Sequence, residues 1–283
     1  MIEFQNVIKN YGSVAAINGV SLNIPESGIY CLLGRNGAGK TTFMKMLAGH
    51  IGASSGQILV EGRQVGPGKM PECVNYIESG AALFNMRVSQ LIEAAAQLQE
   101  NFDLGFARQM MHKFNLNPNK RYKKLSFGMK TMVTAIINLS NNAKVILMDE
   151  PTLGFDAIMR DQFNTLLLES YQANPRVIIV STHLIDEIAK VAERLIIIES
   201  GKILIEAGLD EIDEKAYILS GAKSLVEPLL SKAGLNCIGK NEMGSVVAAY
   251  IYDDRILPPE GVSVDRLGLQ DFFVSIVGGR KNV

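Results

Sequence analysis

The sequence predicts an α/β protein with a mixed β-sheet, followed by a small α+β domain. Three observations predict this fold class. Short runs rich in β-branched residues have the composition of strands buried on both faces of a parallel sheet, and they occupy residues 28–34, 144–150, 176–182 and 194–200. Segments with helical spacing lie between these runs. The first 28 residues instead alternate apolar and polar side chains over short pieces, which favours an antiparallel sheet added to the parallel one.

Two segments between the predicted strands carry a clear helical pattern. KTTFMKMLAG, at residues 40–49, gathers apolar side chains on one face and ends in a glycine that suits a helix C-cap. VSQLIEAAAQLQ, at residues 88–99, repeats apolar residues at the i, i+3, i+4 and i+7 spacing of an amphipathic helix. The alternation of strands and helices therefore extends over about the first 205 residues.

The character of the sequence changes after about residue 205. Residues 206–214 are acidic and poor in β-branched side chains, which predicts a linker between domains of residues 1–205 and 215–283. The second domain is predicted to contain, in chain order, a strand at 217–219, a helix at 223–232, strands at 235–238 and 245–252, and a helix at 269–277. We interpret it as a small α+β accessory domain with a dimerisation or regulatory role, and a ligand-sensing role is the alternative.

Composition limits the functions that the chain can have. Its 28 Lys and Arg residues nearly balance 29 Asp and Glu residues, so the net charge of −1 provides no general attraction to nucleic acid or to an anionic membrane. The three cysteines lie far apart without a CxxC pair, which disfavours a disulfide framework or a zinc site and fits a reducing cytoplasm. No basic segment precedes an apolar one at the start, and no apolar run approaches the roughly 18 residues that span a bilayer. We therefore expect neither a signal peptide nor a membrane-spanning helix.

A complete phosphate-binding motif follows the first predicted buried strand. Residues 34–41, GRNGAGKT, match GxxxxGK[ST], and an amphipathic helix follows. Glycines permit positive φ and let backbone N–H groups converge on a phosphate, and the helix N-terminus adds its dipole. Lys40 is expected to reach the β- and γ-phosphates, and the Thr41 hydroxyl to bind Mg²⁺. The predicted nucleotide-binding residues of the loop are Gly34, Arg35, Asn36, Gly37, Ala38, Gly39, Lys40, Thr41 and Thr42.

A pair of acidic residues ends another predicted strand. In VILMDEP, four apolar residues lead to Asp149, which is expected to hold Mg²⁺, and to Glu150, the candidate general base. An acidic turn after a strand is common on its own. Together with the phosphate-binding motif, it predicts an enzyme of phosphoryl chemistry.

The segment LSFGM, at residues 125–129, resembles the signature motif of the ABC (ATP-binding cassette) ATPases. It precedes by 19 residues the strand that ends in Asp149, and the order of the other motifs agrees with this family over about residues 1–205. The resemblance implies a P-loop NTPase fold with an antiparallel β subdomain and a short helical subdomain at about residues 79–140. It also implies that the chain binds ATP with Mg²⁺ and hydrolyses the ATP.

Four further residues match positions with known roles in this family. Tyr11 stands where an aromatic residue stacks on adenine. Glu78 stands where the glutamine of the Q-loop usually lies near the metal, so its carboxylate is a candidate Mg²⁺ ligand. Asp156, in TLGFD, corresponds to the carboxylate of the D-loop, and His183, in VSTHLIDE, to the switch histidine that takes part in catalysis.

Two cassettes of this family pair head to tail, so that each ATP lies between the phosphate loop of one and the signature motif of the other. ATP then holds the cassettes together, and its hydrolysis lets them separate. Ser126 offers a hydroxyl, and the helix that follows it offers backbone N–H donors to an anion. The resemblance implies that the nucleotide of the partner contacts Leu125, Ser126, Phe127, Gly128 and Met129.

Three positions depart from the usual family pattern. Phe127 replaces a glycine and Met129 replaces a glutamine in the signature motif, while Glu78 replaces an amide with a carboxylate. A phenylalanine with positive φ would be strained, whereas a helical backbone would accept it. The departures resemble those of bacterial cassettes of the ABC-2 exporter group, whose membrane subunit is a separate polypeptide.

The leading hypothesis is the ATPase subunit of a transporter, located in the cytoplasm and peripherally on the inner face of the cell membrane. Its implied partners are a second cassette, identical or paralogous, and an integral membrane permease; export of an unidentified substrate is favoured, and nucleic acid is not expected. A soluble ABC ATPase acting on DNA or the ribosome is an alternative, although the long coiled coil or second cassette typical of such proteins is missing. A regulatory cassette with weak turnover is a third, motivated by Phe127 and Glu78.

Overall fold

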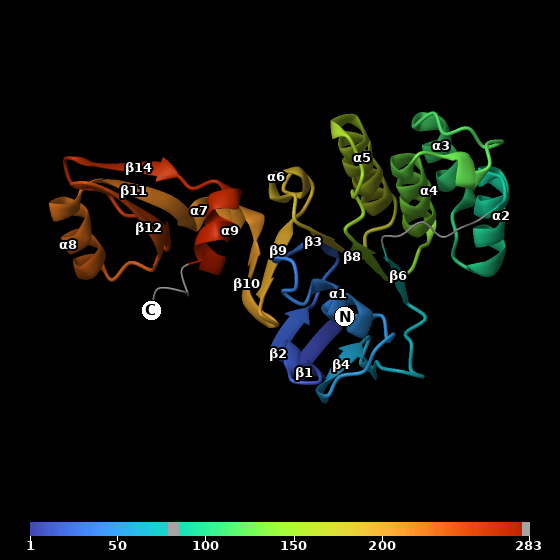
Figure 1. Ribbon diagram of the computed structural model, residues 1–283, viewed down its shortest axis with the longest axis horizontal. Helices are drawn as coiled ribbons and strands as arrows, with labels where there is room; N and C mark the ends of the chain where they lie inside the picture. The colour runs from blue at the N-terminus through green and yellow to red at the C-terminus, as the bar shows by residue number, and fades with distance from the viewer. Residues whose placement is uncertain (79–84, 279–283) are drawn as a thin grey trace. The chain divides into compact units, whose positions relative to one another are not determined.

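The computed structural model describes residues 1–78 and 85–278 (Figure 1). The chain divides into two compact units, one made of Met1–Ala192 with Ile198–Ile203 and the other of Glu193–Ile197 with Leu204–Val283. Within the described residues, no helix is long and apolar enough to cross a bilayer. The α/β class and the mixture of parallel and antiparallel strands predicted from the sequence are confirmed.

A six-stranded sheet contains the predicted parallel strands in the order β10-β9-β3-β8-β7-β6. Its strands are β3 (Gly28–Leu33), β6 (Val74–Glu78), β7 (Val145–Asp149), β8 (Val177–Thr182), β9 (Arg194–Glu199) and β10 (Lys202–Gly208). The pairs β3–β8, β8–β7 and β7–β6 are parallel, and every residue of β3, β7 and β8 is buried. Because parallel strands end at the same edge of a sheet, the residues that follow β3, β7 and β8 meet there.

An antiparallel sheet forms the beginning of the chain, in the order β2-β1-β4-β5. Its strands are β1 (Ile2–Tyr11), β2 (Val14–Ile24), β4 (Ser55–Val60) and β5 (Arg63–Gln64). Helix α1 (Lys40–Leu47) contacts β2 and β4 of this sheet and β7 of the parallel sheet. The ring of Phe4 stacks on that of Phe43 in α1, with 4.4 Å between the ring centroids. Apolar packing on both sides of α1 therefore fixes the helix that follows the phosphate-binding motif.

A group of helices fills the segment that contains the signature motif. Helices α2 (Val88–Leu98), α3 (Leu104–Lys113) and α4 (Phe127–Ser140) pack against one another, and α4 also packs against α5 (Ala157–Ala173) (Figure 1). A 3-10 turn (Tyr122–Lys124) precedes α4, and the short helix α6 (Ile185–Ile188) follows β8. Of the apolar stripe predicted for α2, Val88, Leu91 and Ile92 are buried and Ala95 is half-buried.

The second unit contains a four-stranded antiparallel sheet in the order β12-β13-β11-β14. Its elements are α7 (Leu209–Lys215), β11 (Ala216–Ala222), α8 (Lys223–Ala233), β12 (Cys237–Met243), β13 (Val246–Tyr252), β14 (Val262–Arg266) and α9 (Leu269–Gly278). Val226 and Leu230 of α8 join a core made by side chains of β11, β13 and β14. The five elements predicted for this region are observed, and β14 is an additional strand.

The linker predicted for residues 206–214 is not observed, because these residues form the end of β10 and most of α7. Ile212 is the buried residue of α7, and the helix packs against β11 and β13. Glu211 and Lys215 form an i, i+4 ion pair of 3.0 Å on its exposed side. The acidic composition therefore belongs to the solvent-facing side of a short amphipathic helix.

A buried arginine joins the ends of two helices in the first unit. Arg176 is only 4% exposed and donates to Leu139 O at 2.8 Å, in the last turn of α4, and to Ser170 O at 3.2 Å, in the last turn of α5. Helix C-termini carry partial negative charge and carbonyl groups without helical partners, so this cation stabilises both ends. Burial lowers the pKa of the Arg176 guanidinium to about 10. This value is still well above neutral pH, so the group stays charged there.

Replacing Arg176 with methionine keeps much of the side-chain volume but removes the donors. We expect the free energy of unfolding to fall by about 2–3 kcal/mol, because a buried polar group left unpaired costs about 1–3 kcal/mol. Urea unfolding followed by circular dichroism measures the loss. Arg108→Met is the matched control, since Arg108 is exposed and its ion pair with Glu93 is 3.6 Å long. Equal losses in both variants would contradict the role given to Arg176.

Candidate active site

The phosphate loop (residues 34–41) connects β3 to α1 and has the backbone that its glycines predict. Gly39, at the N-cap of α1, has a φ of 113°. A Cβ at this position would lie 2.5 Å from the carbonyl oxygen of Ala16, so no other residue fits without displacing the backbone. The loop and the N-terminus of α1 together provide the N–H-rich concavity that binds phosphate.

Lys40 is the first residue of α1 and is only 7% exposed. Its Nζ donates to Gly34 O at 2.7 Å and to Arg35 O at 3.3 Å, so the ammonium group lies over the loop. Glu150 Oε1 lies 4.0 Å from the same nitrogen. The sequence prediction that Lys40 serves phosphates is consistent with this position, because a fixed cation borders the same cavity as the loop backbone.

Asp149 ends β7 and is held by two hydroxyl groups. Thr41 Oγ1 donates to Asp149 Oδ2 at 2.7 Å, and Ser181 Oγ donates to Asp149 Oδ1. A hydroxyl and a carboxylate side by side are oxygen ligands of the kind that Mg²⁺ prefers, with nucleotide phosphates and water completing its octahedron. The part of the chain that the structure describes contains no group of three or more His, Cys, Asp or Glu side chains able to hold a metal on its own.

Glu150 follows β7 in a backbone conformation that is rare for a residue with a side chain, with a φ of 48°. Its N–H is held by Ser181, with 3.1 Å both to the carbonyl oxygen and to Oγ. Its Oε2 lies 2.9 Å from His183 Nδ1. Strained conformations of this kind persist where neighbouring contacts fix them, and they are frequent at active sites. Of the three residues predicted to act in catalysis, Glu150, His183 and Lys40, the first two are therefore in direct contact.

Ser181 is a functional residue that the sequence prediction missed. It lies opposite Asp149 in the β7–β8 pair, and one hydroxyl both donates to Asp149 and accepts from Glu150. The signal in the sequence was the position of this serine near the end of a buried strand, two residues before His183. Its role depends on which strand lies beside β8, and this is set by the sheet order.

Lys40, Asp149 and Glu150 border one cavity of about 360 Å³ at the carboxyl edge of the parallel sheet, and Ser181 and His183 contact the two carboxylates' residues from outside its lining. It is lined by Ala16, Arg35, Asn36, Gly37, Gly39, Lys40, Thr41, Thr42, Asp149 and Glu150. Ala38 is buried and its N–H donates to Arg35 O at 3.1 Å, so it shapes the loop without lining the cavity. Ala16 of β2 adds a wall that the sequence did not indicate.

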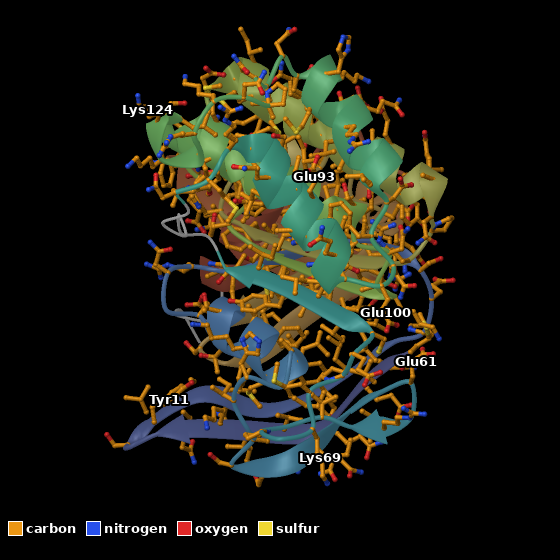
Figure 2. The ribbon with its side chains drawn as sticks, turned by 90° about the vertical axis from the view of Figure 1, so that its right-hand side faces the viewer. Tyr11, Glu61, Lys69, Glu93, Glu100 and Lys124 are labelled. Atoms are coloured by element: carbon orange, nitrogen blue, oxygen red, sulfur yellow. The ribbon has the colours of Figure 1, made fainter. Side chains whose placement is uncertain are left out.

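Tyr11 lies away from the lining of this cavity. Figure 2 shows it at one end of the antiparallel sheet, where its side chain is 50% exposed. Lys9 Nζ lies 5.2 Å from the centroid of its ring, in a cation–π contact. The adenine-stacking role of Tyr11 stays a prediction.

Glu78 ends β6 directly beside Asp149, its partner in the β6–β7 pair. Its backbone therefore reaches the edge of the sheet where the metal is expected. The side chain of Glu78 lies outside the described residues, so its role as a Mg²⁺ ligand stays a prediction.

The signature segment (residues 125–129) opens α4. Ser126 is the N-cap, and its Oγ accepts a hydrogen bond from Met129 N at 3.3 Å. Phe127 is helical, so the strain that positive φ would impose on a phenylalanine does not arise. Leu125 and Gly128 are buried, whereas the Phe127 ring is exposed. None of these residues lines the cavity at Lys40, which is what a site contributed to a second cassette requires.

The D-loop (residues 152–156) leads from Glu150 to α5. Asp156 caps that helix, since its Oδ1 accepts from Met159 N at 2.8 Å. The carboxylate that the family resemblance singled out is thus fixed by a local hydrogen bond.

Comparison with known proteins identifies the family. Residues 17–153 match the family described as ABC transporter. The lantibiotic transport ATP-binding protein SrtF of Streptococcus pyogenes is 32% identical over 216 residues, which cover 74% of this chain and 92% of that protein. The chain belongs to the ABC transporter ATP-binding family. It is an ABC ATPase, and the sequence-based family prediction is confirmed.

The likeness extends to the second unit of this ABC ATPase. The bacitracin transport ATP-binding protein BcrA of Enterococcus faecalis is 26% identical over 302 residues, covering 99% of this chain and 97% of that protein. Other relatives include a protein named for taurine import. A solved structure of the ATP-binding subunit of an ABC transporter has a TM-score of 0.66 at 21% identity, covers 75% of this chain and 91% of its own, and shows the same fold.

Replacing Ser181 with alanine removes the hydroxyl that donates to the Asp149 carboxylate and accepts from the Glu150 N–H. We expect kcat for ATP hydrolysis to fall about 10–100-fold, the usual effect of losing an outer hydrogen bond to a metal-site ligand. ATP binding at the phosphate loop should persist, because Lys40 and the loop backbone are unchanged. Steady-state hydrolysis and nucleotide titration measure the two effects. Ser263→Ala, on exposed strand β14, is the control, and an unchanged kcat in Ser181→Ala would remove Ser181 from the site.

Proposed function

We propose that this ABC ATPase drives a separate membrane-spanning subunit by pairing with a second cassette around ATP. The observation that carries the proposal is that the phosphate-loop cavity and the signature segment are separate surfaces of one chain. The cavity at the phosphate loop contains Lys40, Thr41 and both acidic residues, whereas the Ser126 end of α4 lies outside its lining. A second chain is needed to bring such a helix end to the γ-phosphate.

The site geometry supports hydrolysis by electrostatic positioning. Lys40 provides a fixed positive charge, and Thr41 and Asp149 provide oxygen ligands for Mg²⁺, which would neutralise phosphate charge when bound. We assign to Glu150 the role of accepting a proton from the attacking water, and to His183 that of orienting its carboxylate; the 2.9 Å contact between them supports both roles. These five groups, brought together at one edge, favour turnover over a purely regulatory cassette.

A groove on the helical segment is the surface that we assign to the membrane subunit. It has a volume of about 460 Å³ between α2, α3 and the loop after α3, and apolar atoms provide most of its surface. Met111 and Ile92 lie in this surface, and methionine suits apolar contacts that must adapt in shape. The residues that line it are Ser89, Ile92, Glu93, Arg108, Met111, His112, Asn115, Leu116, Asn117 and Pro118.

Export is the direction that we propose. The signature departures at Phe127 and Met129 resemble the ABC-2 exporter group, and the relatives SrtF and BcrA are named for transport of a lantibiotic and of bacitracin. A cassette of this kind would be located on the inner face of the cell membrane. Uptake of a candidate substrate into inverted vesicles, with the permease present, would support export, and ATP-driven release from them would contradict it.

Replacing Glu150 with glutamine tests the central proposal. The change removes the general base without altering side-chain size, so we expect hydrolysis to fall about 10²–10⁴-fold. ATP should then accumulate between two chains and convert monomer to dimer, as measured by light scattering after gel filtration. Glu260→Gln, in an exposed loop, is the matched control. A monomeric Glu150→Gln variant at saturating ATP, alone or with its permease, would contradict the proposal.

Replacing Lys40 with alanine should act at a different step. It removes the cation that faces the phosphates, so we expect ATP affinity to fall about 10–100-fold, because a charge-assisted hydrogen bond contributes about 1.5–3 kcal/mol. Titration calorimetry of the Lys40→Ala and Glu150→Gln variants separates loss of binding from loss of chemistry. Equal ATP affinities in the two variants would show that Lys40 does not contact the phosphates.

A further inference from the structure

The signature segment and the D-loop of the same chain fit together through an aromatic ring and a glycine. A Cβ built on Gly154 would lie 2.2 Å from Cδ1 and 2.6 Å from Cε1 of Phe127. The ring therefore occupies the space that any other residue at position 154 would need. Gly154 also has a φ of 79°, which L side chains rarely adopt.

A second glycine brings the backbones of the two segments together. A Cβ on Gly128 would lie 3.1 Å from Gly154 O and 2.9 Å from Met159 Sδ, in the first turn of α5. The first turn of α4 is thus packed directly on the D-loop and on the start of the helix that follows it. Displacement of α4 relative to the D-loop would require one of these contacts to break.

The turn that carries Gly154 begins at the catalytic base. Leu153 N donates to Glu150 O at 3.2 Å, and Phe155 N donates to Thr152 O at 3.1 Å. Phe155 is buried and anchors the far end of the turn. Only three residues separate Glu150 from Gly154, and both ends of this short turn have positive φ. A force on Gly154 therefore reaches the backbone of Glu150 through a short hydrogen-bonded path.

Apart from its contact with Gly154, Phe127 contributes little to the packing of the core. Its side chain is 46% exposed, so it contributes less to the hydrophobic core than a buried phenylalanine would. Its backbone is helical and unstrained. What distinguishes the position is the contact with Gly154, together with its place next to Ser126, the residue expected to face the nucleotide of the second cassette.

We infer that Phe127 is a positioning residue that links the signature segment to Glu150 of the same chain through Gly154. The inference rests on the proposed function, because it assumes that nucleotide held by a second cassette contacts the Ser126 end of α4. Engagement of α4 then presses the Phe127 ring on the D-loop and sets the carboxylate of Glu150 for proton transfer. Each cassette would hydrolyse its own ATP efficiently only when its signature segment is engaged.

A double-mutant cycle with a pairing measurement tests this link. Phe127→Ala should lower kcat about 10-fold, as loss of an outer contact to a catalytic group does. In the Glu150→Gln background, the same change should leave ATP-driven pairing within about twofold, the usual limit of independent effects. Gly154→Ala should lower kcat as well. The Phe127→Ala, Gly154→Ala double variant should lose less kcat than the product of the two single losses, because the collision is gone and only the backbone penalty of a side chain at a φ of 79° is left.

Two further variants serve as controls. Phe127→Tyr keeps the ring on Gly154 and should retain the kcat of the unmodified protein. Gly62→Ala introduces a side chain at a φ of 73° with nothing within 4 Å of the new Cβ, so it measures the backbone penalty without a collision. It should leave kcat unchanged. If Gly154→Ala does not fold, the kcat and pairing values of Phe127→Ala and Phe127→Tyr decide the question.

Three results would overturn the inference. The first is an unchanged kcat in Phe127→Ala, and the second is a kcat in the double variant that falls by the product of the losses in Phe127→Ala and Gly154→Ala. The third is a loss of ATP-driven pairing in Phe127→Ala as large as its loss of kcat, which would indicate direct contact with the partner's nucleotide. Failure of Glu150→Gln itself to pair with ATP would instead contradict the proposed function. The two failures are therefore distinguishable.

Discussion

Parallel pairing of β7 with β8 determines where the charged groups of the site lie. The register places Asp149 beside Ser181, whose hydroxyl holds that carboxylate and the Glu150 N–H at the same time. Because β3 pairs with the other side of β8, the phosphate loop begins at the same edge. Thr41 and Asp149 thereby form a hydrogen bond across 108 residues of sequence. Every chemical role assigned to this edge depends on that strand order.

The two ends of helices α4 and α5 have different surroundings: the C-terminal ends contact a buried arginine, and the N-terminal ends belong to the segments with proposed functions. Both end at Arg176, a buried cation that donates to Leu139 O in the last turn of α4 and to Ser170 O in the last turn of α5. Both begin at functional segments, where Ser126 and Asp156 provide the N-caps. The first turn of α4 packs on the D-loop and on the first turn of α5 through Gly128, Gly154 and Met159, so a displacement of one N-terminal segment would act directly on the other.

The contact between these two segments changes how the departures from the usual signature pattern are interpreted. Phe127 in place of a glycine is accepted because the backbone is helical, and its ring finds room because position 154 has no side chain. The two positions are complementary in size, one large and one without a side chain. The departure at Phe127 is therefore matched by the glycine at position 154, which leaves space for the ring.

Local sequence patterns determined much of this protein. The phosphate loop, the strand that ends in Asp149, and the helix that starts at Ser126 follow from glycine conformation, apolar runs and capping, each of which acts over a few residues. Even so, the local pattern at residues 206–214 was misleading. It predicted a linker, whereas these residues form the end of β10 and most of α7, in which Ile212 is buried.

Tertiary structure alone decided the rest. The roles of Ser181 and Arg176, the wall at Ala16 and the fit of Phe127 to Gly154 all join residues that are far apart in the sequence. Strand order, and the packing distance between one helix and the next turn, set these contacts. No single segment contains that information, because a hydrogen bond or a steric fit is a property of two surfaces and becomes defined only when folding brings them together.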